Sequence, residues 1–145
     1  MFKHILFPTD GEAPSEAAIA PCLAFAKDIG ARLTVLHVTA PFRVLSTRAE
    51  MLVDTPDDYA AHSMTRARAC LERVAAAARA QGVVYETLTT EHDHPYQAIL
   101  DAARRRQCDL VAMASHGRAG VRALLLGSET QKVLTHSHLP VLVFR

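Results

Sequence analysis

The chain is organised around residues 109–131, which begin Asp109-Leu110-Val111-Ala112-Met113-Ala114-Ser115-His116-Gly117 and end Gly127-Ser128-Glu129-Thr130-Gln131. The first part has the pattern of a buried strand that runs into a loop of small residues, and the last part begins a helix. Glycines let a backbone approach a ligand closely, and the N–H groups at a helix N-terminus favour negative charge. Ligands of open α/β sheets bind at the carboxyl ends of strands, so this stretch predicts an anion site.

Length and composition are those of one globular domain, predicted over residues 1–145. The 145 residues are 50% hydrophobic and 21% charged, with a net charge of +1. The compact basic run Arg104-Arg105-Arg106 ends a predicted helix, where solvated cations that complement the dipole are favoured over a nucleic-acid patch. No apolar run approaches the length of a membrane span. We therefore expect a cytoplasmic protein that binds neither nucleic acid nor a membrane.

The three cysteines are scattered and show no metal-like spacing, so they are predicted to be buried, reduced thiols. They are Cys22, Cys70 and Cys108.

Hydrophobic periodicity predicts five strands that alternate with four helices. The strands are expected at residues 3–8, 32–38, 83–90, 109–113 and 140–144, and the helices at residues 15–29, at 58–81, from 95 and from 128. The third strand is the most polar, which places it near a sheet edge. Residues 39–57 show no clear pattern and are expected to be a functional loop or to contain a short helix.

Local signals predict where the helices begin and end. Ser15 is an expected N-cap, and Ser128 with Gln131 matches a capping box. Pro95 is expected at the first position of its helix. Gly30 and Gly82 are expected to end the helices that precede them. Val133 and Leu134 are expected on the buried face of the last helix.

Alternating strands and helices are typical of a doubly wound, three-layer α/β sandwich of the Rossmann-like kind. In such a sheet, ligands bind where the strand order reverses. The turn after the first strand, Pro8-Thr9-Asp10-Gly11, and the stretch after the fourth strand carry the best ligand chemistry. They form one site only if these two strands are neighbours.

Five segments spread over essentially the whole chain carry a family pattern. They are residues 5–11, 36–38, 115–118, 124–128 and 140–144. Together they resemble the universal stress protein family. The nucleotide-binding branch of that family is marked by a glycine, two residues, a glycine, nine residues, and a glycine followed by serine or threonine. Gly117, Gly127 and Ser128 match this pattern, whereas Ala114 replaces its first glycine.

The resemblance implies a five-stranded parallel sheet in the order 3-2-1-4-5, bound ATP or another adenine nucleotide with Mg²⁺, and a homodimer paired through residues 140–145. The predicted nucleotide-binding residues are Pro8, Thr9, Asp10, Val38, Met113, Ala114, His116, Gly117, Arg118, Gly127, Ser128, Glu129 and Thr130. Asp10 is also the residue expected to help hold Mg²⁺.

Two of these residues raise physical questions. If the position of Ala114 needs only a small side chain, the nucleotide site survives; if it needs a positive φ, affinity falls. The carboxylate of Glu129 would repel phosphates unless it turns away or meets a divalent cation.

Other chemistry is less well supported. The pairs His92/His94 and His136/His138 lack an accompanying cysteine or carboxylate cluster, so exposed loop histidines are favoured over a metal site. His116 has no evident nucleophile or orienting partner for a catalytic role. Asp10 as a phospho-acceptor would need an acidic pair and a lysine that the chain does not supply at the expected places.

Three functional hypotheses follow. The first is a stress-response protein that binds an adenine nucleotide and acts through conformation and protein partners as a homodimer. The second is an interaction module of the same fold without nucleotide affinity. The third, slow ATP hydrolysis, lacks a Walker lysine and an evident water-positioning residue.

Overall fold

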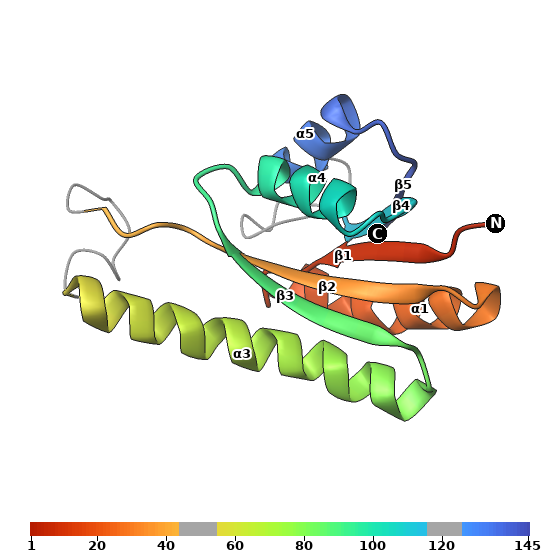
Figure 1. Ribbon diagram of the computed structural model, residues 1–145, viewed down its shortest axis with the longest axis horizontal. Helices are drawn as coiled ribbons and strands as arrows, with labels where there is room; N and C mark the ends of the chain where they lie inside the picture. The colour runs from red at the N-terminus through yellow and green to blue at the C-terminus, as the bar shows by residue number, and fades with distance from the viewer. Residues whose placement is uncertain (44–54, 116–125) are drawn as a thin grey trace.

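A computed structural model describes residues 1–43, 55–115 and 126–145, in which strands and helices alternate (Figure 1). In chain order they are β1 (His4–Pro8), α1 (Ala13–Ile29), β2 (Arg32–Thr39), α3 (Pro56–Gln81), β3 (Tyr85–Glu91), α4 (Pro95–Arg105), β4 (Leu110–Ala114), α5 (Ser128–His136) and β5 (Val141–Phe144). Within the described ranges, none of the helices combines the length and apolar character needed to span a bilayer.

The five strands form one parallel sheet in the order β3-β2-β1-β4-β5. This confirms the predicted α/β class and strand order. The chain builds outward from β1 to β3 and then returns to the other side of β1 with β4. The polar third strand lies at a sheet edge, as predicted.

Two hydrophobic layers cover the two faces of the sheet (Figure 1). Beneath α1 and α3 the core contains Phe7 and Val74, and beneath α4 and α5 it contains Leu6 and Val133. The strands are nearly continuous apolar runs because both of their faces are buried, which is the usual pattern of a covered parallel sheet.

Helices α1 and α3 begin earlier than the sequence predicts. α1 begins at Ala13, and Ser15 lies buried in its first turn, so the N-cap prediction for Ser15 is wrong. Pro14 favours this start because its fixed φ suits a first helical turn. α3 begins two residues before its predicted start, since the Thr55 Oγ1 caps it by accepting the N–H of Asp58 at 3.2 Å.

The capping box predicted for α5 is also wrong. Gly127 is the N-cap residue, no side chain caps this end, and Ser128 is already the first helical residue. The Gln131 side chain instead donates to the Leu126 carbonyl at 3.1 Å. The N-terminal turn of α5 therefore keeps its backbone N–H groups uncapped by its own serine.

Other local predictions fare better. Gly30 and Gly82 end α1 and α3 in the left-handed region, with φ of 67° and 72°, and Pro95 is the first residue of α4. Val133 is fully buried, but Leu134 is 41% exposed, so the buried face predicted for α5 was too wide.

Candidate functional site

Residues that follow or end β1 and β4 meet at the carboxyl edge of the sheet. β1 pairs with β2 on one side and with β4 on the other, where Leu6 lies opposite Val111. The turn at residues 8–11 therefore lies at the same edge as Met113 and Ala114. This is the strand-order reversal at which open α/β sheets bind ligands.

The turn after β1 is held by Thr9, which is only 4% exposed. Its N–H donates to the Leu36 carbonyl at 2.9 Å, and the His37 Nδ1 lies 3.0 Å from its carbonyl oxygen. Its Oγ1 accepts the Gly11 N–H at 3.3 Å and lies 3.6 Å from the Cys70 Sγ of α3. Thr9 thus fixes the shape of the turn.

Asp10 and Gly11 complete this turn. The Asp10 Oδ1 accepts the Glu12 N–H at 2.9 Å, an Asx-type turn that holds the half-buried carboxylate beside the strand end. Gly11 has a φ of +78°, and a Cβ there would lie 3.3 Å from the Cys70 Sγ. The backbone angle therefore favours glycine, and a Cβ there would require small shifts of the Cys70 thiol and of the Arg73 guanidinium, which would lie 3.2 Å away.

Ala114 is the last residue of β4 and has ordinary strand geometry. Among the described non-glycine residues, only Gln107 has a positive φ. The Ala114 side chain is 7% exposed and packs in the core under α1 and α3, together with Phe7. Its methyl group therefore neither strains the backbone nor lies in the layer that contains α5.

The N-terminus of α5 is fastened to the end of β4. The Gly127 N–H donates to the Ser115 carbonyl at 2.6 Å, and the buried Thr130 Oγ1 donates to the Ala114 carbonyl at 3.0 Å. The N–H groups of residues 128–130 lie in the first helical turn, where no intrahelical acceptor exists. Together with the helix dipole they favour an anion.

The Glu129 side chain turns toward α4. Its Oε2 accepts the backbone N–H of Tyr96 at 2.9 Å, and its Oε1 accepts from the Lys132 Nζ at 3.1 Å. Of the two arrangements considered for this carboxylate, turning away or meeting a cation, the structure shows the first.

The remaining predicted site residues lie partly beyond the described ranges. Val38 is half-buried near the end of β2, opposite Thr90 of β3. His116, Gly117 and Arg118 lie outside the described residues.

Sequence reasoning missed three residues that shape this region. His37 and Cys70 contact Thr9 and hold the turn, and the backbone N–H of Tyr96 donates to the Glu129 carboxylate. A polar residue near the end of a buried strand is a signal for His37. No local signal exists for Cys70 or Tyr96, because each acts on a residue distant in the sequence.

The histidine pairs do not assemble a metal centre in the part of the chain that the structure describes. No group of three or more His, Cys, Asp or Glu residues there could hold a metal ion. The His92 Nδ1 accepts the His94 N–H at 2.8 Å, and the His136 Nδ1 donates to the Lys132 carbonyl oxygen at 2.8 Å. His94, His136 and His138 are exposed, as predicted, but His136 is the last residue of α5 rather than a loop residue, and His92 is half-buried.

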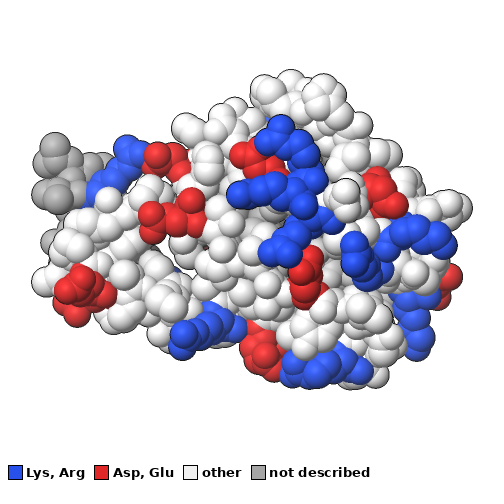
Figure 2. Space-filling model, in the orientation of Figure 1, with Lys and Arg blue, Asp and Glu red and all other residues white. Residues whose placement is uncertain are grey.

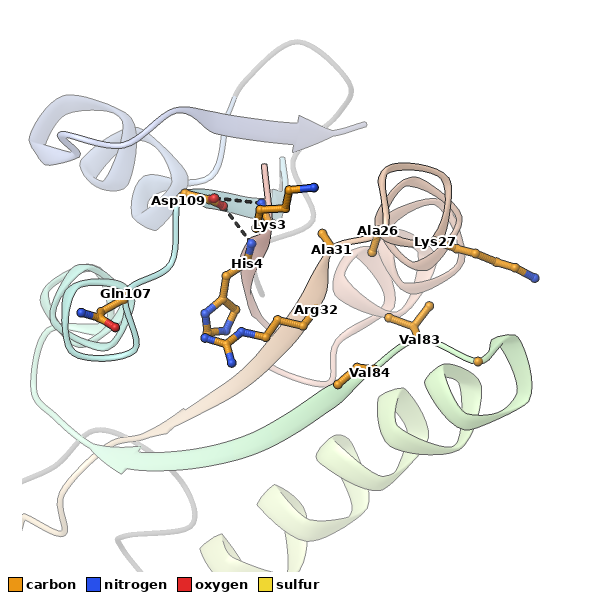
Figure 3. Close-up of a pocket in the computed structure, with 12 residues that line it drawn as sticks. Lys3, His4, Ala26, Lys27, Ala31, Arg32, Val83, Val84, Gln107 and Asp109 are labelled. Atoms are coloured by element: carbon orange, nitrogen blue, oxygen red, sulfur yellow. Dashed lines mark hydrogen bonds between the residues drawn. The ribbon is translucent and has the colours of Figure 1, made fainter. Parts of the chain in front are cut away.

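A cavity of about 640 Å³ opens at the opposite, amino-terminal edge of the sheet (Figure 3). Lys27 lines it but points away from it in Figure 3. Asp109 accepts the N–H groups of Lys3 at 2.8 Å and His4 at 2.9 Å. Burial raises the pKa of the Asp109 carboxyl, but the hydrogen bonds from His4 and Lys3, together with that from its own backbone and the charge of His4, lower the pKa overall. Asp109 thus joins β1 to β4 and is not part of the predicted site.

Comparison with known proteins assigns the family. Residues 1–145 match the universal stress protein family, and the chain belongs to it. A universal stress protein of Thermus aquaticus is 34% identical over 150 residues, which cover 100% of both chains. The solved structure of MJ0577, a protein of Methanocaldococcus jannaschii, has a TM-score of 0.83 at 26% identity and covers 99% of this chain and 95% of that chain.

Two further solved structures share the fold. A universal stress protein in complex with cAMP has a TM-score of 0.72 at 22% identity, covering 99% of this chain and 97% of that chain. The universal stress protein from Archaeoglobus fulgidus in complex with dAMP has a TM-score of 0.69 at 14% identity, covering 100% and 98%.

Proposed function

We propose that this universal stress protein binds ATP or another adenine nucleotide, with Mg²⁺, and acts as a regulatory homodimer through other proteins. The observation that carries the proposal is the meeting of three features at one sheet edge: the turn after β1, the end of β4 and the first turn of α5. The residues proposed to contact the nucleotide are Pro8, Thr9, Asp10, Val38, Met113, Ala114, His116, Gly117, Arg118, Gly127, Ser128, Glu129 and Thr130.

The geometry of Ala114 supports this proposal. Its backbone is extended and its methyl lies in the core under α1. The replacement of the first motif glycine therefore leaves the space between β4 and α5 unaltered. Two solved structures of the same fold, a universal stress protein in complex with cAMP and one in complex with dAMP, support the choice of an adenine nucleotide as the ligand.

Asp10 suits a role beside Mg²⁺. Its Oδ1 accepts one N–H, from Glu12, and a carboxylate has about four lone-pair sites. Mg²⁺ commonly takes one or two protein carboxylates, and the substrate phosphates and water supply its other ligands. Asp10 would hold the ion and orient the phosphates. The remaining proposed residues would bind the nucleotide and would not catalyse a reaction on it.

The proposal is tested by calorimetric titration of the purified protein with ATP, with and without Mg²⁺. Mass analysis of small molecules released on denaturation accompanies it. We expect saturable binding that Mg²⁺ strengthens and that Asp10→Ala weakens. Absence of binding at millimolar ATP would reject nucleotide binding.

That negative result would favour the second candidate, an interaction module without nucleotide. The bond from the Gly127 N–H to Ser115 supports this candidate, because it occupies a donor that a phosphate would otherwise receive. ADP production that disappears in Asp10→Ala would instead support slow hydrolysis.

The homodimer is proposed to form through residues 140–145. Among the strands that the structure describes, β5 ends the sheet and pairs with β4 alone, and its four apolar residues are all half-buried. An apolar edge strand of this kind is usually covered or paired. Antiparallel pairing with a second copy would close the edge symmetrically.

Charge and cysteine chemistry support the remaining parts of the proposal. Lys and Arg gather over α4 on the face drawn in Figure 2. In that region Arg104 pairs with Asp101 at 3.0 Å and Arg106 with Glu86 at 3.3 Å, so part of the basic run is neutralised and we propose no nucleic-acid or membrane partner. The three cysteines are free and buried, which is consistent with the cytoplasmic location that we propose.

A further inference from the structure

Glu129 belongs to α5 but completes the N-terminus of α4. Tyr96 is the second residue of α4, so its N–H has no acceptor within that helix. The N-cap residue of α4, His94, makes no side-chain cap, and the first turn of α4 contains no acidic residue. The Glu129 Oε2 supplies both the missing cap and the missing negative charge. It accepts the Tyr96 N–H at 2.9 Å and places a carboxylate at the helix N-terminus.

This contact is the one among the described hydrogen bonds that fixes the first turn of α5 from the side of α4. The other two, from Gly127 to Ser115 and from Thr130 to Ala114, both fasten it to the end of β4. With hydrogen bonds to a single strand end alone, only the packing of Val133 against the core beneath α4 would oppose rotation of the first turn about that end. The bond to Tyr96 adds a support in a second direction.

The surrounding contacts keep the carboxylate in this orientation. Its second oxygen accepts from the Lys132 Nζ at 3.1 Å, and the same ammonium lies 5.7 Å from the centre of the Tyr96 ring. The His136 ring also packs against Tyr96, and the centroids of the two rings are 5.1 Å apart. Both carboxylate oxygens are therefore engaged between α4 and α5.

We propose that the side chain of Glu129 has a positioning role: it caps α4 and thereby holds the first-turn N–H groups of α5, including that of Glu129 itself, where the nucleotide phosphates bind. It is not a ligand of the metal ion. The role toward phosphate rests on the proposed nucleotide binding, whereas the cap on α4 exists without it.

The test compares Glu129→Ala, Glu129→Gln and Lys132→Met. Glutamine keeps an oxygen acceptor for Tyr96 but is a poor Mg²⁺ ligand, and Lys132→Met removes the ion pair while it retains an apolar stem over the ring. Two quantities are measured for each variant: hydrogen exchange of the Tyr96 amide by NMR without nucleotide, and the Kd for ATP with and without Mg²⁺.

We expect Glu129→Ala to speed Tyr96 exchange about tenfold and to weaken ATP binding about fivefold, the size of effect that loss of a helix cap produces. Glu129→Gln should restore both values to within about twofold and keep the Mg²⁺ dependence, and Lys132→Met should stay near the wild type because exposed ion pairs contribute little. The Mg²⁺ comparison distinguishes a positioning residue from a metal ligand. Replacing a positioning residue leaves the Mg²⁺ dependence of ATP binding unchanged, whereas replacing a metal ligand reduces it.

Loss of the Mg²⁺ dependence in Glu129→Gln would overturn the proposal and make Glu129 a metal ligand. Unchanged Tyr96 exchange or unchanged ATP affinity in Glu129→Ala would also overturn it. If the wild-type protein binds no ATP, the proposed function fails, and Tyr96 exchange alone then decides whether Glu129 caps α4.

Discussion

Ala114 occupies the place of a motif glycine, and its own conformation determines what the extra methyl costs. The residue is extended, and the methyl fills part of the core under α1. We expect Ala114→Gly to lower the free energy of unfolding by about 1–2 kcal/mol, from lost burial and greater backbone freedom. Its ATP affinity should equal that of the wild type. Binding that appears only in Ala114→Gly would show that the methyl obstructs the ligand; urea unfolding and titration measure both effects.

His4 makes the stability dependent on pH. It is 4% exposed, its Nε2 lies 2.7 Å from the Thr34 Oγ1, and that hydroxyl donates to Glu86 at 2.6 Å. Burial, with a smaller contribution from Arg32, lowers the pKa of His4 below its ordinary value of 6.5. The neutral ring is thus favoured in the folded state. The resulting stability is fully present above pH 6.5 and is lost as the pH falls through the lowered pKa.

The variant His4→Gln tests this dependence, because its amide keeps a donor for Thr34 but does not titrate. Urea unfolding between neutral pH and about pH 5 should show a steeper loss of stability for the wild type than for His4→Gln, since carboxylates titrate mostly below this range. Parallel curves for the two proteins would contradict the prediction.

At the scale of elements, the start of α1 depends on its contact with α3. Gly11 and Gly30 both have positive φ, but a Cβ at Gly11 would meet the Cys70 Sγ at 3.3 Å, whereas one at Gly30 would meet nothing within 4 Å. Alanine at either position costs about 1 kcal/mol of backbone strain. Gly11→Ala should cost about 1 kcal/mol more than Gly30→Ala because of overpacking.

Cys70→Ala should recover part of this extra cost when it is combined with Gly11→Ala, since the smaller side chain makes room for the new methyl group. Chemical denaturation of the single and double variants measures the coupling. Equal losses in Gly11→Ala and Gly30→Ala would show that the contact with α3 does not constrain the turn.

At the scale of the whole molecule, the two sheet edges permit a matched test of the dimer. The Pro140 carbonyl accepts the N–H of Val111 in β4 at 3.1 Å, and the Phe144 carbonyl accepts the N–H of Ser115, the residue after β4, at 2.8 Å. Alternate residues point their backbone groups to opposite edges of a strand, so those of Val143 face the open edge. Val143→Pro removes the Val143 N–H, a donor that faces the open edge, and leaves the hydrogen bonds between β5 and β4 intact.

Thr87→Pro is the control for this substitution. The Val84 carbonyl accepts from β2 at 2.9 Å, so the backbone groups of Thr87 face the open edge of β3. We expect sedimentation at micromolar concentration to show a wild-type dimer, a monomeric Val143→Pro and a dimeric Thr87→Pro. A dimer in all three proteins would place the interface elsewhere.

Local patterns of sequence predicted much of this molecule. Buried runs such as residues 5–7 specify strands because both faces of a covered parallel sheet exclude water. Gly30 and Gly82 mark helix ends because a positive φ costs glycine nothing. The prediction that β1 and β4 are adjacent in the sheet came only from the family resemblance, because local periodicity does not encode strand order.

The sequence by itself determined the class of fold, the extents of most elements and the identity of the loops that could meet a nucleotide. Tertiary structure alone decided how side chains at those loops are used. Ser15 and Ser128 are not caps, Thr9 is held by Cys70 from α3, and Glu129 caps a helix other than its own. The physical reason is distance along the chain: a propensity acts within one helical turn, whereas a hydrogen bond between residues 33 or 61 positions apart exists only after the layers have packed.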